Sequence, residues 1–221
     1  MIKYLRWPFL ALLATLMMPS LWTGPIVIGS ALEWEDGEYR FAGGTSPQAL
    51  AIAAVTIFLY ILLMYAPPAK TGSLMTGIVR RFVAFWLDFI LAVFAIAPIL
   101  GTIPTLVEWR RTGVFAWSFE RATYASADPF IDVGITLMMF AALGFYFAWP
   151  LVRSRPSPGS CILGYQIVSD DGSGMTFRAA IHRMFRGSFA LWFLEPFKSR
   201  RSELGKFRLD EKFGTHAVKL R

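Results

Sequence analysis

Hydrophobic positions gather in four long stretches that are separated by shorter polar segments. These stretches cover residues 7–28, 47–66, 80–98 and 130–152. Each is close to the ~20 apolar residues that a membrane-spanning helix needs. The pattern therefore predicts an all-α integral membrane protein with about four transmembrane helices.

The first stretch follows two basic residues and is interrupted by helix breakers. Lys3 and Arg6 precede it, and Pro8, Pro19 and Pro25 lie within it. This layout is typical of a signal peptide or a signal anchor. We favour the anchor, because the stretch is longer than a signal-peptide core and no clear cleavage site follows it. The prolines predict a kinked or shortened helix.

Two polar segments lie between the stretches on the side that we expect to face outwards. Residues 31–46 are acidic and contain Asp36-Gly37, which predicts a small β-hairpin or an ordered loop. The third stretch is expected to continue past bends at Pro98 and Pro104 towards Val107. Residues 108–129 then read as a mixed loop whose aromatic side chains suit a membrane interface.

The chain is basic and apolar, with 22 Lys and Arg, 15 Asp and Glu, a net charge of +7 and 55% hydrophobic residues. Four spans with a cytoplasmic amino terminus place 18 of the 22 basic residues inside and four outside. This asymmetry agrees with the positive-inside rule. We expect a multi-pass protein of a cell membrane, the inner membrane in a bacterium, with both termini cytoplasmic and no nucleic-acid partner.

The segment after the fourth stretch predicts an amphipathic helix at about 176–194. Apolar residues occupy one side of it and basic residues the other: Phe177, Ala180, Ile181 and Met184 against Arg178, His182, Arg183 and Arg186. Such a helix can lie in the inner headgroup region and bind anionic lipid, or it can pack against the helix bundle. A small cytoplasmic tail completes the chain.

One carboxylate, Asp88, stands inside the third apolar stretch. Inserting a lone aspartate there costs roughly 2.5–3.5 kcal/mol, so such a residue is a functional-site candidate. Arg81 precedes it by seven residues, nearly two helical turns, and lies on the same helix face. Asp88 must therefore find a partner, hold a proton or contact water.

Three sequence blocks resemble the RDD family of membrane proteins, which is named for one arginine and two aspartates. The first block is R-x-x-A-x-x-x-D from Arg81 to Asp88, the second is SPGSCILGYQIVSDDG at 157–172, and the third is LDEKFGTHAV at 209–218. The resemblance covers about residues 76–221 and makes Asp210 the second aspartate. Two membrane helices with an outer hairpin, at 1–66, form an addition. Ser160 and Gln166 stand where the family often has basic residues.

The resemblance leaves two functions open. In the first, which we favour, Arg81, Asp88 and Asp210 form a polar cluster with a structural or accessory role, supported by Arg183, Gly164, Gly214 and Thr215. In the second, the cation/proton exchange suggested for some family members, Asp88 binds a proton or a monovalent cation. Four spans are few for such a carrier, so it would require a homo-oligomer.

Enzyme chemistry has little support in the sequence. No zinc-protease, hydrolase or phosphate-loop motif occurs, and the two histidines, His182 and His216, lie far apart. Cys161 is the only cysteine, so neither an intrachain disulfide nor a paired-cysteine metal site is possible. We expect no catalytic residue, no metal and no cofactor.

Overall fold

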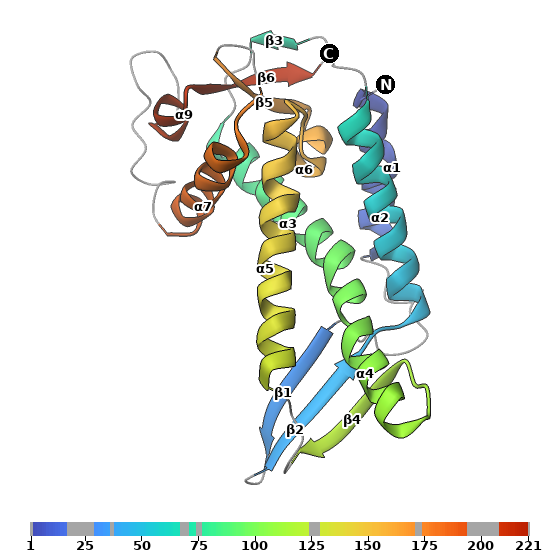
Figure 1. The fold of residues 1–221 in the computed structure, drawn as a ribbon. Coiled ribbons are helices and arrows are strands. Elements are labelled where there is room, and N and C mark those ends of the chain that lie inside the picture. Colours follow the sequence, from blue (N-terminus) through green and yellow to red (C-terminus); the bar gives the residue numbers. More distant parts are fainter. Residues whose placement is uncertain are drawn as a thin grey trace. The chain divides into compact units, whose positions relative to one another are not determined.

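The computed structural model describes residues 2–16, 29–35, 38–66, 71–73, 77–123, 129–170, 174–193 and 208–220. The chain forms two compact units, one made of Met1–Ala14, Phe58–Leu91 and Gly144–Arg221, the other of Thr15–Ile57 and Ala92–Leu143. Figure 1 labels the elements, which are α1 (Ile2–Leu16), β1 (Gly29–Glu35), β2 (Glu38–Gly44), α2 (Pro47–Tyr65), β3 (Thr71–Ser73), α3 (Ile78–Leu100), α4 (Thr102–Thr112), β4 (Ser118–Thr123), α5 (Pro129–Val152), α6 (Pro158–Ile162), β5 (Tyr165–Ser169), α7 (Phe177–Phe193), α9 (Arg208–Phe213) and β6 (Thr215–Leu220).

Three helical segments are long and apolar enough to cross a membrane, by length and composition. They are Pro47–Tyr65, Val79–Thr112 and Val133–Val152, found among the described residues. The first predicted stretch differs, because α1 begins at Ile2 and ends at Leu16. Its 15 residues extend only about 22 Å. Residues 17–28, where the stretch was expected to continue, lie outside the described residues. The mostly helical character is confirmed, and the described residues contain three candidate spans.

The third stretch continues further than the sequence predicted. α3 contains Pro98, and after a turn at Gly101 the chain enters α4 and stays helical to Thr112. Gly113 ends α4 with a φ of +73°, and its N–H donates to the carbonyl of Trp109. The predicted loop at 108–129 was therefore wrong in part. It begins with helix and contains the strand β4, two features that its mixed polarity concealed.

The acidic hairpin is confirmed and acquires a third strand. β1 and β2 pair antiparallel, with Glu35 opposite Glu38, and β4 pairs antiparallel with β2. The order in this sheet is β1-β2-β4. The turn residues Asp36 and Gly37 lie outside the described residues.

A second three-stranded sheet joins β3, which precedes α3, to the C-terminal strands β5 and β6, with the order β3-β6-β5. The central strand β6 pairs antiparallel with both neighbours, and Tyr165 lies opposite Lys219. The sequence expectation included the hairpin strands β1 and β2, but neither the strand β4 nor this second sheet. Strands of three to seven residues offer too few positions for a two-residue period to stand out against the long apolar stretches.

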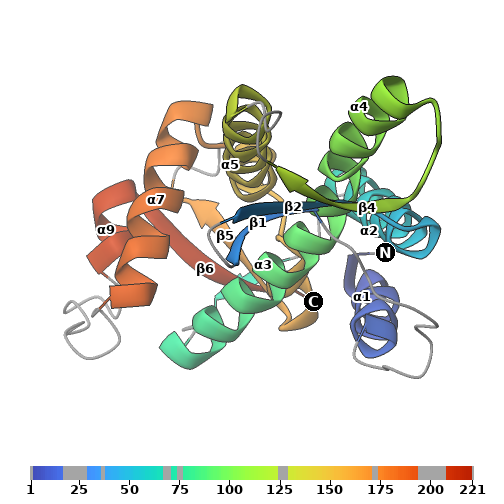
Figure 2. The ribbon, with the colours of Figure 1, turned by 90° about the horizontal axis from the view of Figure 1, so that it is seen from below.

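The helix expected at about 176–194 is present as α7, and most of its predicted faces agree with the structure: Ala180 is buried, whereas Arg178, His182 and Arg186 are exposed. Two positions differ, since Arg183 is 7% exposed and Phe177 is 47% exposed. α7 packs against the bundle near Gly144 of α5, where a side chain on that glycine would contact Ile181. Seen from below, α7 and α9 lie side by side, with β6 running past them (Figure 2).

Candidate functional site

Three residues of the R-x-x-A-x-x-x-D block share one face of α3 because they are spaced by three and four positions. Each of them meets a different part of the C-terminal region within the same compact unit. We call Arg81, Ala84 and Asp88 the contact face. Ala84 and Asp88 are buried, and the Arg81 side chain is 13% exposed.

Asp88 receives two hydrogen bonds from the start of α6. The hydroxyl of Ser157 donates to its Oδ2 at 2.5 Å, and the backbone N–H of Gly159 donates to its Oδ1 at 2.6 Å. Ser157 is also the N-cap of α6, and Pro158 is its first residue. A helix start leaves N–H groups unsatisfied and favours negative charge. Both oxygens of the carboxylate are thus occupied by groups that need an acceptor.

Gly159 lies so close to α3 that no side chain fits. A Cβ on Gly159 would overlap the carbonyl oxygen of Ala84 and lie 3.0 Å from Cγ of Asp88. Ala84 is itself 2% exposed and packs in a small core with Tyr165 and Ala217. The small residues on both sides allow α6 to approach closely enough for its hydrogen bonds to Asp88.

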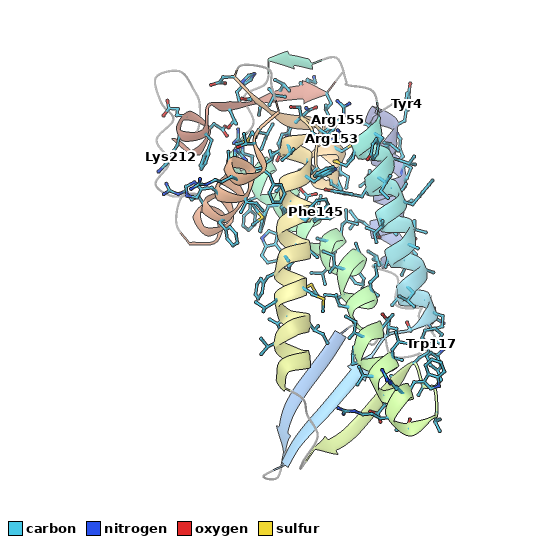
Figure 3. All side chains as sticks on the ribbon, in the orientation of Figure 1. Tyr4, Trp117, Phe145, Arg153, Arg155 and Lys212 are labelled. Atoms are coloured by element: carbon cyan, nitrogen blue, oxygen red, sulfur yellow. The ribbon has the colours of Figure 1, made fainter. Side chains whose placement is uncertain are left out.

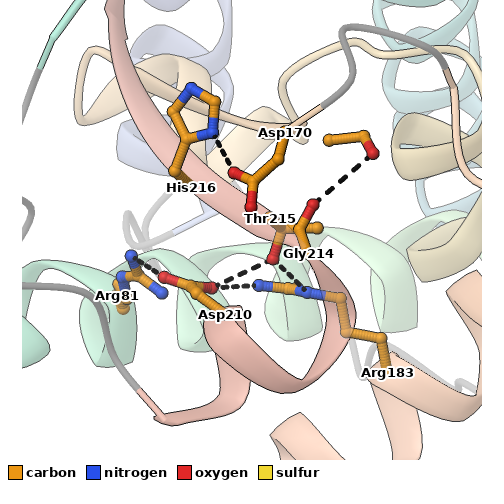
Figure 4. Close-up of polar contacts among 8 residues, drawn as sticks. Arg81, Asp170, Arg183, Asp210, Gly214, Thr215 and His216 are labelled. Carbon is orange, nitrogen blue, oxygen red and sulfur yellow. Dashed lines mark hydrogen bonds and ion pairs between the residues drawn. The ribbon is translucent and has the colours of Figure 1, made fainter. Parts of the chain in front are cut away.

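Asp210, at the start of α9, lies between two arginines (Figure 4). Its Oδ2 is 2.6 Å from Arg81 and its Oδ1 is 2.8 Å from Arg183, while its side chain is 2% exposed. Thr215 completes the cluster, since its hydroxyl donates to Asp210 and accepts from Nε of Arg183. Burial lowers the pKa of Arg183, and the charge of Asp210 opposes that shift. One carboxylate therefore pairs with both arginines, and the cluster keeps a net positive charge.

Two glycines with positive φ make the turns that place this region. Gly164, at +73°, joins α6 to β5, and its carbonyl accepts from the N–H of Leu220 at 3.1 Å. Gly214, at +56°, joins α9 to β6, and its carbonyl accepts from the N–H of Asp170 at 2.7 Å. Left-handed backbone of this kind suits glycine best.

The structure places the predicted site residues in two groups. Asp88 is held by α6, whereas Arg81 pairs with Asp210 and, through it, with Arg183 and Thr215. Tyr165 is buried near both groups. Its pKa is raised by burial first and then by the charge of Asp88, while the two arginines lower it.

Sequence reasoning missed Ser157 and Gly159 as partners of Asp88, although both lie in the SPG block. The available signal was a serine followed by proline, which is typical of a helix start. The two departures from the family pattern are also accommodated within the chain. Ser160 Oγ donates to the carbonyl of Ser157 at 2.9 Å, and Gln166 Nε2 donates to the carbonyl of Ser154 at 2.6 Å.

The described part of the chain contains no group of three or more His, Cys, Asp or Glu side chains that could hold a metal ion. The contact face binds groups of the protein itself: Asp88 accepts hydrogen bonds from Ser157 and Gly159, and Arg81 pairs with the carboxylate of Asp210.

A comparison with protein-family models matches the model described as RDD family, over residues 75–199. Neither the curated proteins nor the solved structures contain a match.

Proposed function

Because this chain belongs to the RDD family and carries apolar helices of membrane-spanning length, we propose that it has a structural or accessory role in the membrane. In this role the contact face of α3 holds the C-terminal region in one position. The observation that carries the proposal is the occupation of Asp88, whose two oxygens accept from Ser157 and Gly159.

The second half of the contact face supports the same role. A buried carboxylate is stable only when it is paired and hydrogen-bonded. Asp210 satisfies this requirement with two arginines, one from α3 and one from α7. Through Asp210, α9 and α7 are both joined to α3. We call these two helices and the sheet β3-β6-β5 the C-terminal platform.

We place this platform in the cytoplasm, on the inner surface of the cell membrane, because the positive-inside rule puts most Lys and Arg there. α7 then turns its exposed residues Arg178, His182, Phe185 and Arg186 towards anionic headgroups. Reporter fusions test this topology. A reporter that works only in the cytoplasm should be active when it is fused after residue 221, and a reporter that works only outside the cytoplasm should be inactive there. The reverse result would contradict the orientation.

The substitution Asp88→Asn tests the role of the contact face. It keeps the shape of the side chain, but its amide NH2 cannot accept, so the bond from Gly159 becomes neutral and the hydroxyl of Ser157 must turn to accept; each bond is weakened by about 1 kcal/mol. We expect the midpoint of thermal unfolding in detergent to fall by roughly 4–8 °C. Asp170→Asn is the control: its side chain is 41% exposed and pairs with His216 at the surface, and because exposed pairs contribute only ~0–1 kcal/mol, this change should alter the midpoint little.

The same variants separate this role from ion transport. In vesicles that contain the purified parent protein, we expect no proton flux that requires Na⁺ or K⁺. Asp88→Asn should therefore remove no such flux. If Asp88→Asn abolishes such a flux and leaves thermal stability unchanged, the carboxylate serves transport and the structural proposal is wrong.

A further inference from the structure

Two arginines at the C-terminal end of α5 differ from Arg81 and Arg183 in the partners of their side chains. Figure 3 labels Arg153 and Arg155 at this end of the helix. Whereas Arg81 and Arg183 share Asp210, neither Arg153 nor Arg155 has a carboxylate or carbonyl partner for its side chain within the described residues.

Arg153 is exposed and is positioned by aromatic rings from two helices. Its guanidinium carbon lies 5.2 Å from the ring centre of Tyr65, at the end of α2, and 5.7 Å from that of Trp149. The Trp149 ring is in turn stacked on Phe145 at 4.9 Å. Stacking on aromatic faces leaves the N–H groups at the edge of the guanidinium available for hydrogen bonds.

Arg155 carries a buried donor without an acceptor. Its Nε is shielded from solvent and has no hydrogen-bond partner in the described structure. Such an unsatisfied donor is rare in folded proteins. Because a second basic side chain, Arg153, stands two positions away, an anion is the partner that suits this place best.

The turn between the two arginines is fixed in an uncommon conformation. Ser154 has a φ of +48°, the only positive φ among the described non-glycine residues. Its carbonyl accepts from Gln166 of β5 at 2.6 Å, and the N–H of Arg155 donates to the carbonyl of Pro150 at 2.8 Å. These bonds stabilise the left-handed turn that holds both arginines at the helix end. Backbone held in this way often marks a functional position.

We propose that Arg153 and Arg155 bind the phosphate of an anionic phospholipid at the end of α5. The aromatic rings of Tyr65 and Trp149 are typical of side chains at the level of the headgroups. Basic pockets between membrane helices at that level bind anionic headgroups. The site requires only that this end of α5 meets a membrane surface, so it stands independently of the structural role proposed for the contact face.

Lipid binding by the purified full-length protein tests the site. Native mass spectrometry in detergent would measure retention of phosphatidylglycerol against phosphatidylcholine for the parent, Arg153→Gln and Arg155→Gln. We expect the parent to prefer phosphatidylglycerol, and each variant to weaken its binding about tenfold or more, because one charge-assisted contact to the phosphate is lost. Arg155→Lys, which keeps the charge, should retain part of the binding.

The control is Arg110→Gln, which removes an exposed arginine of α4 and should leave the preference unchanged. An equal loss in this control would show that only net charge matters and would overturn the proposal, as would a parent without preference for phosphatidylglycerol. If the parent retained inorganic phosphate but no phosphatidylglycerol, the two arginines would bind a soluble phosphate. That result would also overturn the proposal. Unchanged unfolding midpoints in phosphatidylcholine would show that the variants are folded.

Discussion

Adding one methyl group at Gly159 should separate α6 from α3, and the native cysteine can report it. Cys161 is the only cysteine of the chain, lies two residues further along α6 and is 1% exposed. Burial, followed by the charge of Asp88, raises the pKa of its thiol to about 12. In the docked state this thiol is both covered and protonated, so it should react very slowly with a maleimide.

The size of the effect follows from the atoms that Gly159→Ala would meet. The new Cβ would overlap the Ala84 carbonyl oxygen, a backbone atom of α3 that cannot turn aside, and would lie 3.0 Å from Cγ of Asp88. α6 must therefore withdraw and lose both hydrogen bonds to Asp88. Hydrogen bonds to a charged group contribute about 1.5–3 kcal/mol each, which gives a loss of roughly 3–6 kcal/mol. Since 1.4 kcal/mol is a factor of ten, we expect labelling of Cys161 to accelerate about 100-fold or more.

The assay compares labelling rates at pH 8 in detergent, with unfolded protein as the upper limit. Gly77→Ala is the matched control, because a Cβ at Gly77, just before α3, would meet no atom within 4 Å. We expect this control to label at the parent rate. If Gly159→Ala labels within a factor of two of the parent, the close approach of α6 to α3 is not what protects the cysteine, and the reasoning fails.

Three further results are expected. Asp210→Asn leaves two buried guanidinium groups without their shared carboxylate and should lower the free energy of unfolding by about 3–5 kcal/mol. Arg81→Gln leaves the ion pair between Arg183 and Asp210 intact and should lower it less. Thermal unfolding followed by tryptophan fluorescence would rank the two variants, and equal losses of stability would contradict the prediction. Ser157→Ala removes one bond to Asp88 together with the cap of α6, so its Cys161 labelling should fall between those of the parent and Gly159→Ala. In the folded parent, labelling at pH 9 should stay far slower than in unfolded protein at the same pH, because the thiol is 1% exposed and its pKa is raised to about 12; equal rates would refute its burial.

Much of the helical framework could be predicted from the sequence, because the length of apolar stretches and the spacing of their borders are local properties. The hairpin at residues 31–46 and the helix beginning at Phe177 were accessible for the same reason. The partners of buried charges were less accessible. Helical spacing put Arg183 on the basic side of its helix, and only the family resemblance grouped it with Asp210, the residue that explains its burial.

The pairing of Asp88 was also beyond local reasoning. Its nearest basic residue on the helix, Arg81, suggested one cluster, whereas the observed donors come from positions about 70 residues later in the chain. Sequence spacing shows which residues share a helix face, but it does not show which segment will cover that face. The carbonyl of Ala84 and the missing side chain of Gly159 decide this, and both are properties of shape rather than polarity.

The chemistry of the contact face explains why a carboxylate and a short helix occur together. Backbone groups in apolar surroundings must find partners within the protein, and the first N–H groups of a helix have none in the helix itself. Asp88 supplies acceptors for the start of α6, and α6 supplies the donors that make a carboxylate tolerable within an apolar helix. Neither element would be stable there alone. The aspartate of the first block and the SPG of the second therefore form one physical unit, and a change in either should be read as a change in both.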